Sequence, residues 1–427
     1  MEFRNTPPRQ GHLKFKLGNR PQTEKLANGM DLYLINVNST ELVRVDFMFK
    51  GGQWMQEKPL QTAMSMKMLR ECIIDSSLHK IPHYIDYKGV SIDVTSNMSY
   101  CVLSLSCLQR YVCEIIPIIV SVLNNLPFEE DKFRIALEQS KRSFEISMDT
   151  VGEQCKRLFY KSLYGANHPM SRFPEYVDYD SLAIHDLKSY CNKYITAPNC
   201  NVFLTGNLTG GFVSDFINTL QKFGLRNDCG FCNFPIYELP KHDKRYVLEM
   251  EKPLVQSSIR IGREFLSRTH TDYIPMTVLS TILGGYFGSR LMSVIREEKG
   301  YTYDIHSVIY QMPLNSSFVI TTETGNRYVE NVIDDIYVEM DKLSSELILE
   351  DELQQVKNYM LGNMCRNYEF GFGFSNRIMQ LICSDIKLDD IVAGAEIISN
   401  ITSNELRDIS IKYLSPNSMI ECIVTNT

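Results

Sequence analysis

Residues 283–291 read LGGYFGSRL, and residues 295–303, after three intervening positions, read IREEKGYTY. A glycine-rich turn leads into a short amphipathic helix, predicted over Ser289–Lys299, which Gly300 ends. A strand follows from Tyr303. Arg296 and Tyr303 are seven residues apart, one near the end of the helix and one at the start of the strand. This layout lets a guanidinium and a phenol point at the same spot.

Two similar phrases divide the chain into halves. KYITAPN at residues 193–199 precedes a strand predicted over Asn201–Gly206, and KYLSPN at residues 412–417 precedes one over Met419–Thr425. A repeat of this long period indicates two related domains rather than a solenoid. We place the domains at residues 1–225 and 247–427. The stretch 226–246, with its prolines and charge cluster, is the predicted linker.

Strands and helices are grouped rather than alternating, which predicts an α+β fold with a mostly antiparallel sheet in each domain. In the segment Leu42–Lys50, the alternation of apolar residues from Val43 to Phe49 marks one buried face. The other predicted strands are Met30–Asn36, Ser91–Thr95, Tyr100–Cys107, Ser257–Ile261 and Ser317–Glu323. A helical stretch over Glu129–Tyr164 is expected to be broken.

Together the turn, Arg296, Tyr303 and the repeat resemble the pitrilysin (insulinase) family of zinc metallopeptidases. EKLANGMDLY at residues 24–33 is similar to that family's opening strand with its Asn-Gly turn. The resemblance implies two homologous domains of the LuxS and processing-peptidase type. It also implies that Arg296 and Tyr303 hold substrate against a zinc site located elsewhere.

The glycine-rich turn has two interpretations. In position it resembles the glycine-rich loop of the non-catalytic subunit of mitochondrial processing peptidase, which implies that Gly284, Gly285 and Gly288 contribute to substrate binding. The turn is much shorter here, and without the family it is a tight connection between helices. It is not a phosphate loop, because it lacks the G-K-[ST] ending.

The family's zinc motif, H-x-x-E-H, follows a strand that ends in glycine. At the matching place, a helix predicted from about Leu60 has Met64 and Met68 at the histidine positions and Lys67 at the position of the catalytic glutamate. A thioether is a poor zinc ligand and an ammonium repels the cation. Glu145 is near the expected place of the third ligand, but one carboxylate does not hold zinc. We therefore expect no metal in this chain, with the methionines packed in the core and Lys67 a solvated helix charge.

Composition excludes several classes of function. The net charge of −7 over 427 residues leaves no basic footprint for a nucleic acid. The longest apolar run, Tyr111–Leu126, is too short and too polar to span a bilayer, so we expect no membrane partner. The N-terminal residues lack the apolar core of a signal peptide. We expect a cytoplasmic protein, or a periplasmic one if a signal peptide has been removed.

The 12 cysteines are mostly single and lie in apolar segments, as expected for reduced core residues of a cytosolic protein. Cys229 and Cys232 form the one C-x-x-C pair, which lies in the predicted linker. No second pair completes a zinc site, so we interpret this spacing as chance.

Changing both Cys229 and Cys232 to Ser is therefore expected to leave folding and partner binding intact. Circular dichroism of the variant and the mass of its complex with a partner subunit measure the two properties. A large loss of either, relative to the unchanged chain, would mean that these thiols have a structural role in the linker.

The resemblance predicts a metal-free subunit of a heterodimeric zinc peptidase, inactive alone. A homologous partner would carry H-x-x-E-H and zinc, and the two chains would close around a peptide while this chain lends Arg296 and Tyr303 in trans. Such a site commonly receives peptide as an added β-strand. Two alternatives remain open. One is a structural or assembly module like the core subunits of respiratory complexes, and the other is a homodimeric pseudoenzyme that binds peptides without catalysis.

Overall fold

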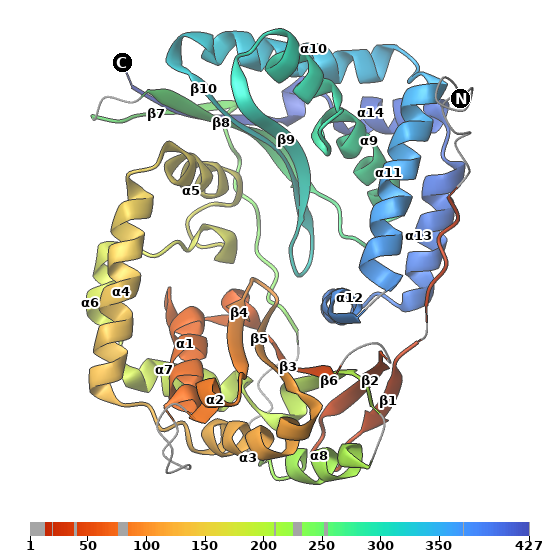
Figure 1. The fold of residues 1–427 in the computed structure, drawn as a ribbon. Coiled ribbons are helices and arrows are strands. Elements are labelled where there is room, and N and C mark those ends of the chain that lie inside the picture. The colour runs from red at the N-terminus through yellow and green to blue at the C-terminus, as the bar shows by residue number, and fades with distance from the viewer. Residues whose placement is uncertain are drawn as a thin grey trace, which may run out of the picture.

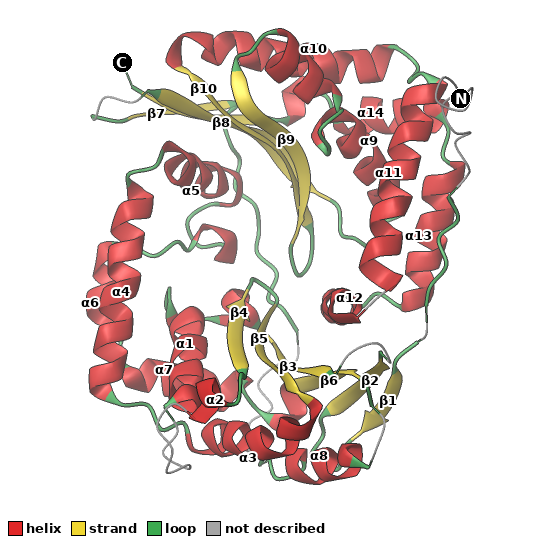
Figure 2. Cartoon of the chain, viewed as in Figure 1, coloured by secondary structure: helices red, strands yellow, loops and turns green. Residues whose placement is uncertain are grey.

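The computed structural model describes residues 13–18, 20–37, 41–75, 84–208, 211–224, 233–251, 255–369 and 371–426. Its strands form two mixed, mostly antiparallel sheets, one from each half of the chain, and helices pack on both (Figures 1 and 2). The strand order of the first sheet is β1 (Gln22–Lys25), β2 (Asp31–Asn36), β6 (Cys200–Gly206), β3 (Leu42–Lys50), β5 (Tyr100–Leu108) and β4 (Ser91–Ser96). The strand order of the second is β7 (Arg245–Glu249), β11 (Ile420–Thr425), β8 (Gln256–Phe265), β10 (Ser316–Gly325) and β9 (Thr302–Gln311). The predicted α+β fold class is confirmed.

The two sheets share one topology. In the first, β6 lies between β2, to which it is parallel, and β3, to which it is antiparallel. In the second, β11 lies in the same way between β7 and β8. Each inserted strand follows a helix and a short 3-10 turn, namely α7 (Ile184–Tyr194) with residues 197–199 and α14 (Ser403–Tyr413) with residues 416–418. These are the places of the two repeated phrases, so the repeat in the sequence is also a repeat in the structure.

Most of the helices surround the sheets. The remaining helices of the first half are α1 (Gln61–Ile74), α2 (Tyr84–Tyr87), α3 (Gln109–Asn125), α4 (Glu130–Met148), α5 (Val151–Tyr164), α6 (Tyr176–Ser181) and α8 (Phe212–Leu220). Those of the second half are α9 (Tyr273–Gly284), α10 (Val329–Ser345), α11 (Glu350–Glu369), α12 (Gly371–Cys383) and α13 (Leu388–Asn400). Among the described residues, no single helix is both long and apolar enough to cross a membrane, and only α3 with α4, bent by 93° at their junction, meet that test as a pair.

Local structure differs from the predicted elements in a few places. The long helical stretch is broken as expected, because Thr150 caps α5 by accepting a hydrogen bond from the backbone N–H of Glu153 at 3.4 Å. The short helix before β9 is a π-helix, η5 (Met292–Glu298), rather than an α-helix. Strand β7 begins at Arg245, within the stretch predicted as a linker.

Helix α5 belongs to the first half of the chain but packs on the second sheet, against β8 and β11 (Figure 1). Phe159 and Leu163 share an apolar cluster with Val319 and Cys422 of that sheet. The helix approaches β8 closely, because a Cβ added to Gly262 would lie 3.0 Å from the Phe159 ring. A glycine inside a strand is typical of such a close approach.

Helix α12 makes the reciprocal crossing, from the second half onto the first sheet. Asp46 of β3 is fully buried there and accepts hydrogen bonds from Ser104 Oγ at 2.6 Å and from Ser375 Oγ of α12 at 3.1 Å. Arg44 Nε lies 2.7 Å from Asp46 Oδ1, and Arg44 Nη2 donates to Asn376 of α12 at 2.7 Å. The face predicted to be buried, from Val43 to Phe49, is buried. The second face is buried as well, because α12 covers Asp46 and Met48.

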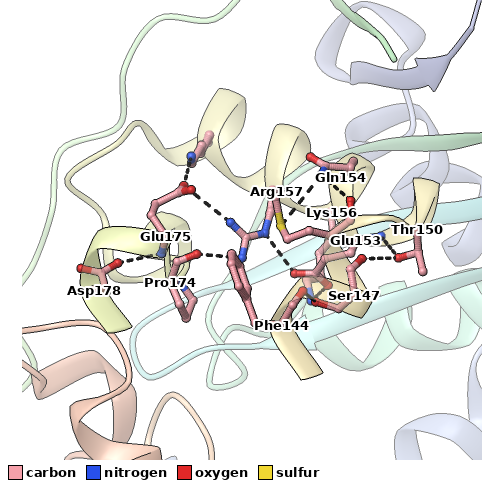
Figure 3. A network of polar contacts seen from close by, with 12 residues as sticks. Phe144, Ser147, Thr150, Glu153, Gln154, Lys156, Arg157, Pro174, Glu175 and Asp178 are labelled. Atoms are coloured by element: carbon pink, nitrogen blue, oxygen red, sulfur yellow. Dashed lines mark hydrogen bonds and ion pairs between the residues drawn. The ribbon is translucent and has the colours of Figure 1, made fainter. Parts of the chain in front are cut away.

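A buried arginine ties α5 to its own half (Figure 3). The Arg157 side chain is 7% exposed and pairs with Glu153 at 3.3 Å and with Glu175, before α6, at 3.5 Å. It also donates to the Pro174 carbonyl at 2.9 Å, and its guanidinium lies 5.3 Å from the centre of the Phe144 ring of α4. The charge is thus neutralised and hydrogen-bonded, as a buried cation requires.

Candidate functional site

Arg296 and Tyr303, the residue pair singled out in the sequence, lie at the free edge of the second sheet. Arg296 is half-buried in η5, which packs on β9 and α10. Tyr303 is the second residue of β9, the edge strand, and is 87% exposed. Within the described ranges neither side chain forms a hydrogen bond or an ion pair. The donors of the guanidinium and of the phenol are therefore available to an external ligand.

A β-bulge sets the direction of Tyr303. Thr302 pairs with Thr324 of β10, and Ile305 pairs with Thr322, so Tyr303 and Asp304 together lie opposite one residue, Glu323. Hydroxyl groups hold the irregularity: Thr302 Oγ1 donates to the Glu323 carbonyl at 2.6 Å, and Thr322 Oγ1 to the Asp304 carbonyl at 2.8 Å. Bulges of this kind re-aim side chains next to binding sites.

His306 lies beside this bulge on β9. Its Nδ1 is 2.9 Å from Asp304 Oδ2, and both side chains are open to solvent, at 44% and 68% exposure. The structure therefore places His306 in an exposed pair with Asp304.

The glycine-rich turn joins α9 to η5 and is held by backbone packing. A Cβ on Gly284 would lie 2.6 Å from the backbone N of Ser307 in β9. The Ser280 and Ser307 hydroxyls are 3.0 Å apart at the same contact. A Cβ on Gly288 would lie 2.9 Å from the Tyr286 ring. The contact at Gly284 reflects the close approach of α9 to the sheet, whereas the contact at Gly288 lies within the turn.

An aromatic contact to Arg296 was not predicted from the sequence. The Phe287 ring of the turn lies under the Arg296 guanidinium, with 4.7 Å from the guanidinium carbon to the ring centre. Phe287 is 63% exposed. Its place in the glycine-rich turn, nine residues before Arg296, was the signal in the sequence that could have indicated the contact.

The helix at the zinc-motif positions, α1, does not suit zinc. Met64 and Met68 are buried in the core of the first half, as predicted for packing residues. Lys67 is half-buried rather than solvated: its Nζ donates to the Ala136 carbonyl at 3.3 Å and to Gln139 Oε1 at 3.1 Å, both on α4. Glu145 is exposed further along α4. Over the described ranges, no group of three or more His, Cys, Asp or Glu side chains is placed to hold a metal ion.

The structure does not unite the predicted residues in one site. Helix α1 packs on the first sheet, whereas η5 and β9 belong to the second, in the other half of the fold (Figure 1). Cys229 and Cys232 lie outside the described residues. Burial raises the pKa of the Cys155 thiol to about 11 and that of Cys101 to about 12, which disfavours their reactive thiolates.

The chain is similar to known proteins in sequence and in fold. Residues 181–360 match the family model described as the Peptidase M16 inactive domain. Over 296 residues the chain is 20% identical to the uncharacterized zinc protease YmxG of Bacillus subtilis, covering 69% of this chain and 70% of that protein. A crystal structure of a peptidase M16 inactive domain from Pseudomonas fluorescens superposes with a TM-score of 0.85 at 19% identity, covering 95% of this chain and 98% of the other. A chain of Complex III2 from Candida albicans has the same fold, with a TM-score of 0.75 at 12% identity and 95% coverage of both chains.

Proposed function

Because residues 181–360 match the inactive domain of the M16 peptidases, we propose that this chain is the zinc-free subunit of a heterodimeric zinc peptidase. Its partner would be a homologous chain with an intact H-x-x-E-H motif. This chain would supply Arg296 and Tyr303 in trans, and a peptide bound between the subunits would be the substrate.

The observation that carries this proposal is the contrast between the two halves. At the zinc-motif positions of the first half, two methionines are packed in the core and a lysine is bonded to a neighbouring helix. In the second half, Arg296 and Tyr303 have no hydrogen-bond partner among the described residues. A chain with free donors for a peptide and, among its described residues, no ligand set for zinc suits the complementing role.

The chemistry of the pair fits a peptide carbonyl. A guanidinium carries a fixed charge and several N–H donors, and a phenol donates one O–H. Donors that meet a carbonyl oxygen as negative charge develops on it stabilise a tetrahedral transition state. Neither group can generate a nucleophile, so the attacking water and its metal would belong to the partner.

The purified chain alone is accordingly expected to hold no stoichiometric zinc and to cleave no peptide. Elemental analysis of the dialysed protein measures the first property, and a fluorogenic peptide assay measures the second. Mixing with the H-x-x-E-H partner should bring activity. A partner variant with Gln in place of the motif's glutamate should remain inactive in the mixture, which assigns the activity to the partner's site.

About one tightly bound zinc per chain, with the N/O coordination of a tetrahedral site, would overturn this proposal. A partner that is fully active without this chain would instead favour the structural alternative.

A further inference from the structure

The contact of Arg296 with the Phe287 ring differs from the way this protein holds a structural arginine. Arg157 lies against aromatic rings as well, but it also has two carboxylates and a carbonyl as partners (Figure 3). Arg290, in the same connection as Arg296, is bound by both oxygens of Glu352 at 2.8 and 2.9 Å. In the described part of the chain, the Arg296 guanidinium has no hydrogen bond or ion pair, and the Phe287 ring is its only partner.

A ring and a carboxylate have different consequences for a guanidinium. A carboxylate occupies the N–H donors, whereas the face of a phenyl ring attracts the cation and leaves those donors free. A ring is therefore the partner that suits an arginine whose donors must meet a ligand.

Two contacts anchor the turn just before Phe287. Tyr286 lies 5.1 Å from Tyr359 of α11, ring centre to ring centre. The backbone at Gly284 lies against β9. The neighbours of Phe287 are thus fixed by packing, while its own ring remains mostly open to solvent. The contact with Arg296 explains why the large apolar side chain of Phe287 is exposed at this fixed position.

We propose that Phe287 is a positioning residue, whose ring holds the Arg296 guanidinium in place for a bound peptide while leaving its N–H groups free. This role rests on the proposed function, in which Arg296 meets the substrate. The ring contact itself does not depend on that function, so the two can be tested apart.

The kinetic test uses Phe287→Leu, Phe287→Tyr and Phe287→Trp in the reconstituted heterodimer. Loss of a cation–π contact predicts a fall in kcat/KM of about 3- to 30-fold for the leucine variant, while the Tyr and Trp variants keep most of the activity. In an Arg296→Ala background, Phe287→Leu should have no further effect, because the two residues act as one unit. Tyr87→Leu, which removes an aromatic side chain of α2 that is 76% exposed, is the matched control and should change nothing.

A spectroscopic readout follows the contact without any partner. In the isolated chain the side-chain Nε–Hε signal of Arg296 should carry a ring-current shift that Phe287→Leu removes and Phe287→Trp retains. If Phe287→Leu leaves the kinetics unchanged while Arg296→Ala slows the reaction, the role of the ring is overturned and the proposed function stands. Equal losses of activity for the Leu and Trp variants would have the same meaning. If Arg296→Ala has no kinetic effect while the ring-current shift is present, the proposed function fails and the role of the ring fails with it.

Discussion

Arg296→Ala and Tyr303→Phe are each expected to lower kcat of a heterodimer reconstituted with an H-x-x-E-H partner by about 10²–10³-fold, without loss of zinc. The reason is that a preorganised hydrogen-bond donor stabilises the negatively charged oxygen of the transition state more than the neutral carbonyl oxygen of the bound substrate. The metal and its ligands would belong to the other chain, so the zinc content of the heterodimer should not change. Steady-state kinetics on a short fluorogenic peptide, with zinc content and complex mass followed in parallel, measure the effect.

Two matched variants control for general damage. Tyr87→Phe removes the hydroxyl of another tyrosine that is largely exposed, and Arg407→Ala removes another half-buried arginine of the second half. Both should leave kcat and KM as they are. A change confined to KM would mean that the pair binds substrate and transition state equally. Unchanged kinetics in an intact dimer would reduce this chain to a structural partner.

Phe159→Ala is expected to lower the free energy of unfolding by about 3–5 kcal/mol. Phe159 of α5 is fully buried against the second sheet, and its removal leaves a cavity where the two halves are joined. Denaturant unfolding measures the loss. The fluorescence of Trp54, the single tryptophan, and the far-UV circular dichroism should change together, because the halves exchange helices.

Lys161→Ala, at an exposed position of the same helix, is the control. It removes an ion pair with Glu175 whose side chains are both 47% exposed, and such pairs contribute less than about 1 kcal/mol. A similar small loss for Phe159→Ala, or separate transitions for Trp54 and for the secondary structure, would contradict the coupling of the halves.

The sequence predicted what depends on local pattern. The strand Leu42–Lys50 is found with the predicted bounds, because its alternation reflects contacts with its own half. The burial of Asp46 on the other face could not be predicted, since α12, which covers it, lies more than 300 residues later in the chain. Long-range contacts of this kind leave no period in the sequence.

The same limit applies to the candidate site. Arg296 and Tyr303 were found through their spacing and their resemblance to a motif, and their lack of internal partners emerged only from the fold. Lys67 was predicted to be solvated because a lone lysine on a helix usually is. Its bonds to α4 depend on how two helices cross, which the pattern of α1 does not record.

The exchange of α5 and α12 also has a consequence for how the protein is made. Helix α5 is complete at Tyr164, but β11, part of the sheet it covers, begins only at Ile420. Ribosomes add about 5–20 residues per second, so roughly 10–50 s pass before that strand has been synthesised. Throughout that interval the apolar side of α5 has no finished sheet to pack on, so the nascent chain exposes apolar surface of the kind that chaperones bind. A message cut short before β11 would leave α5 in that state permanently and expose the product to proteolysis.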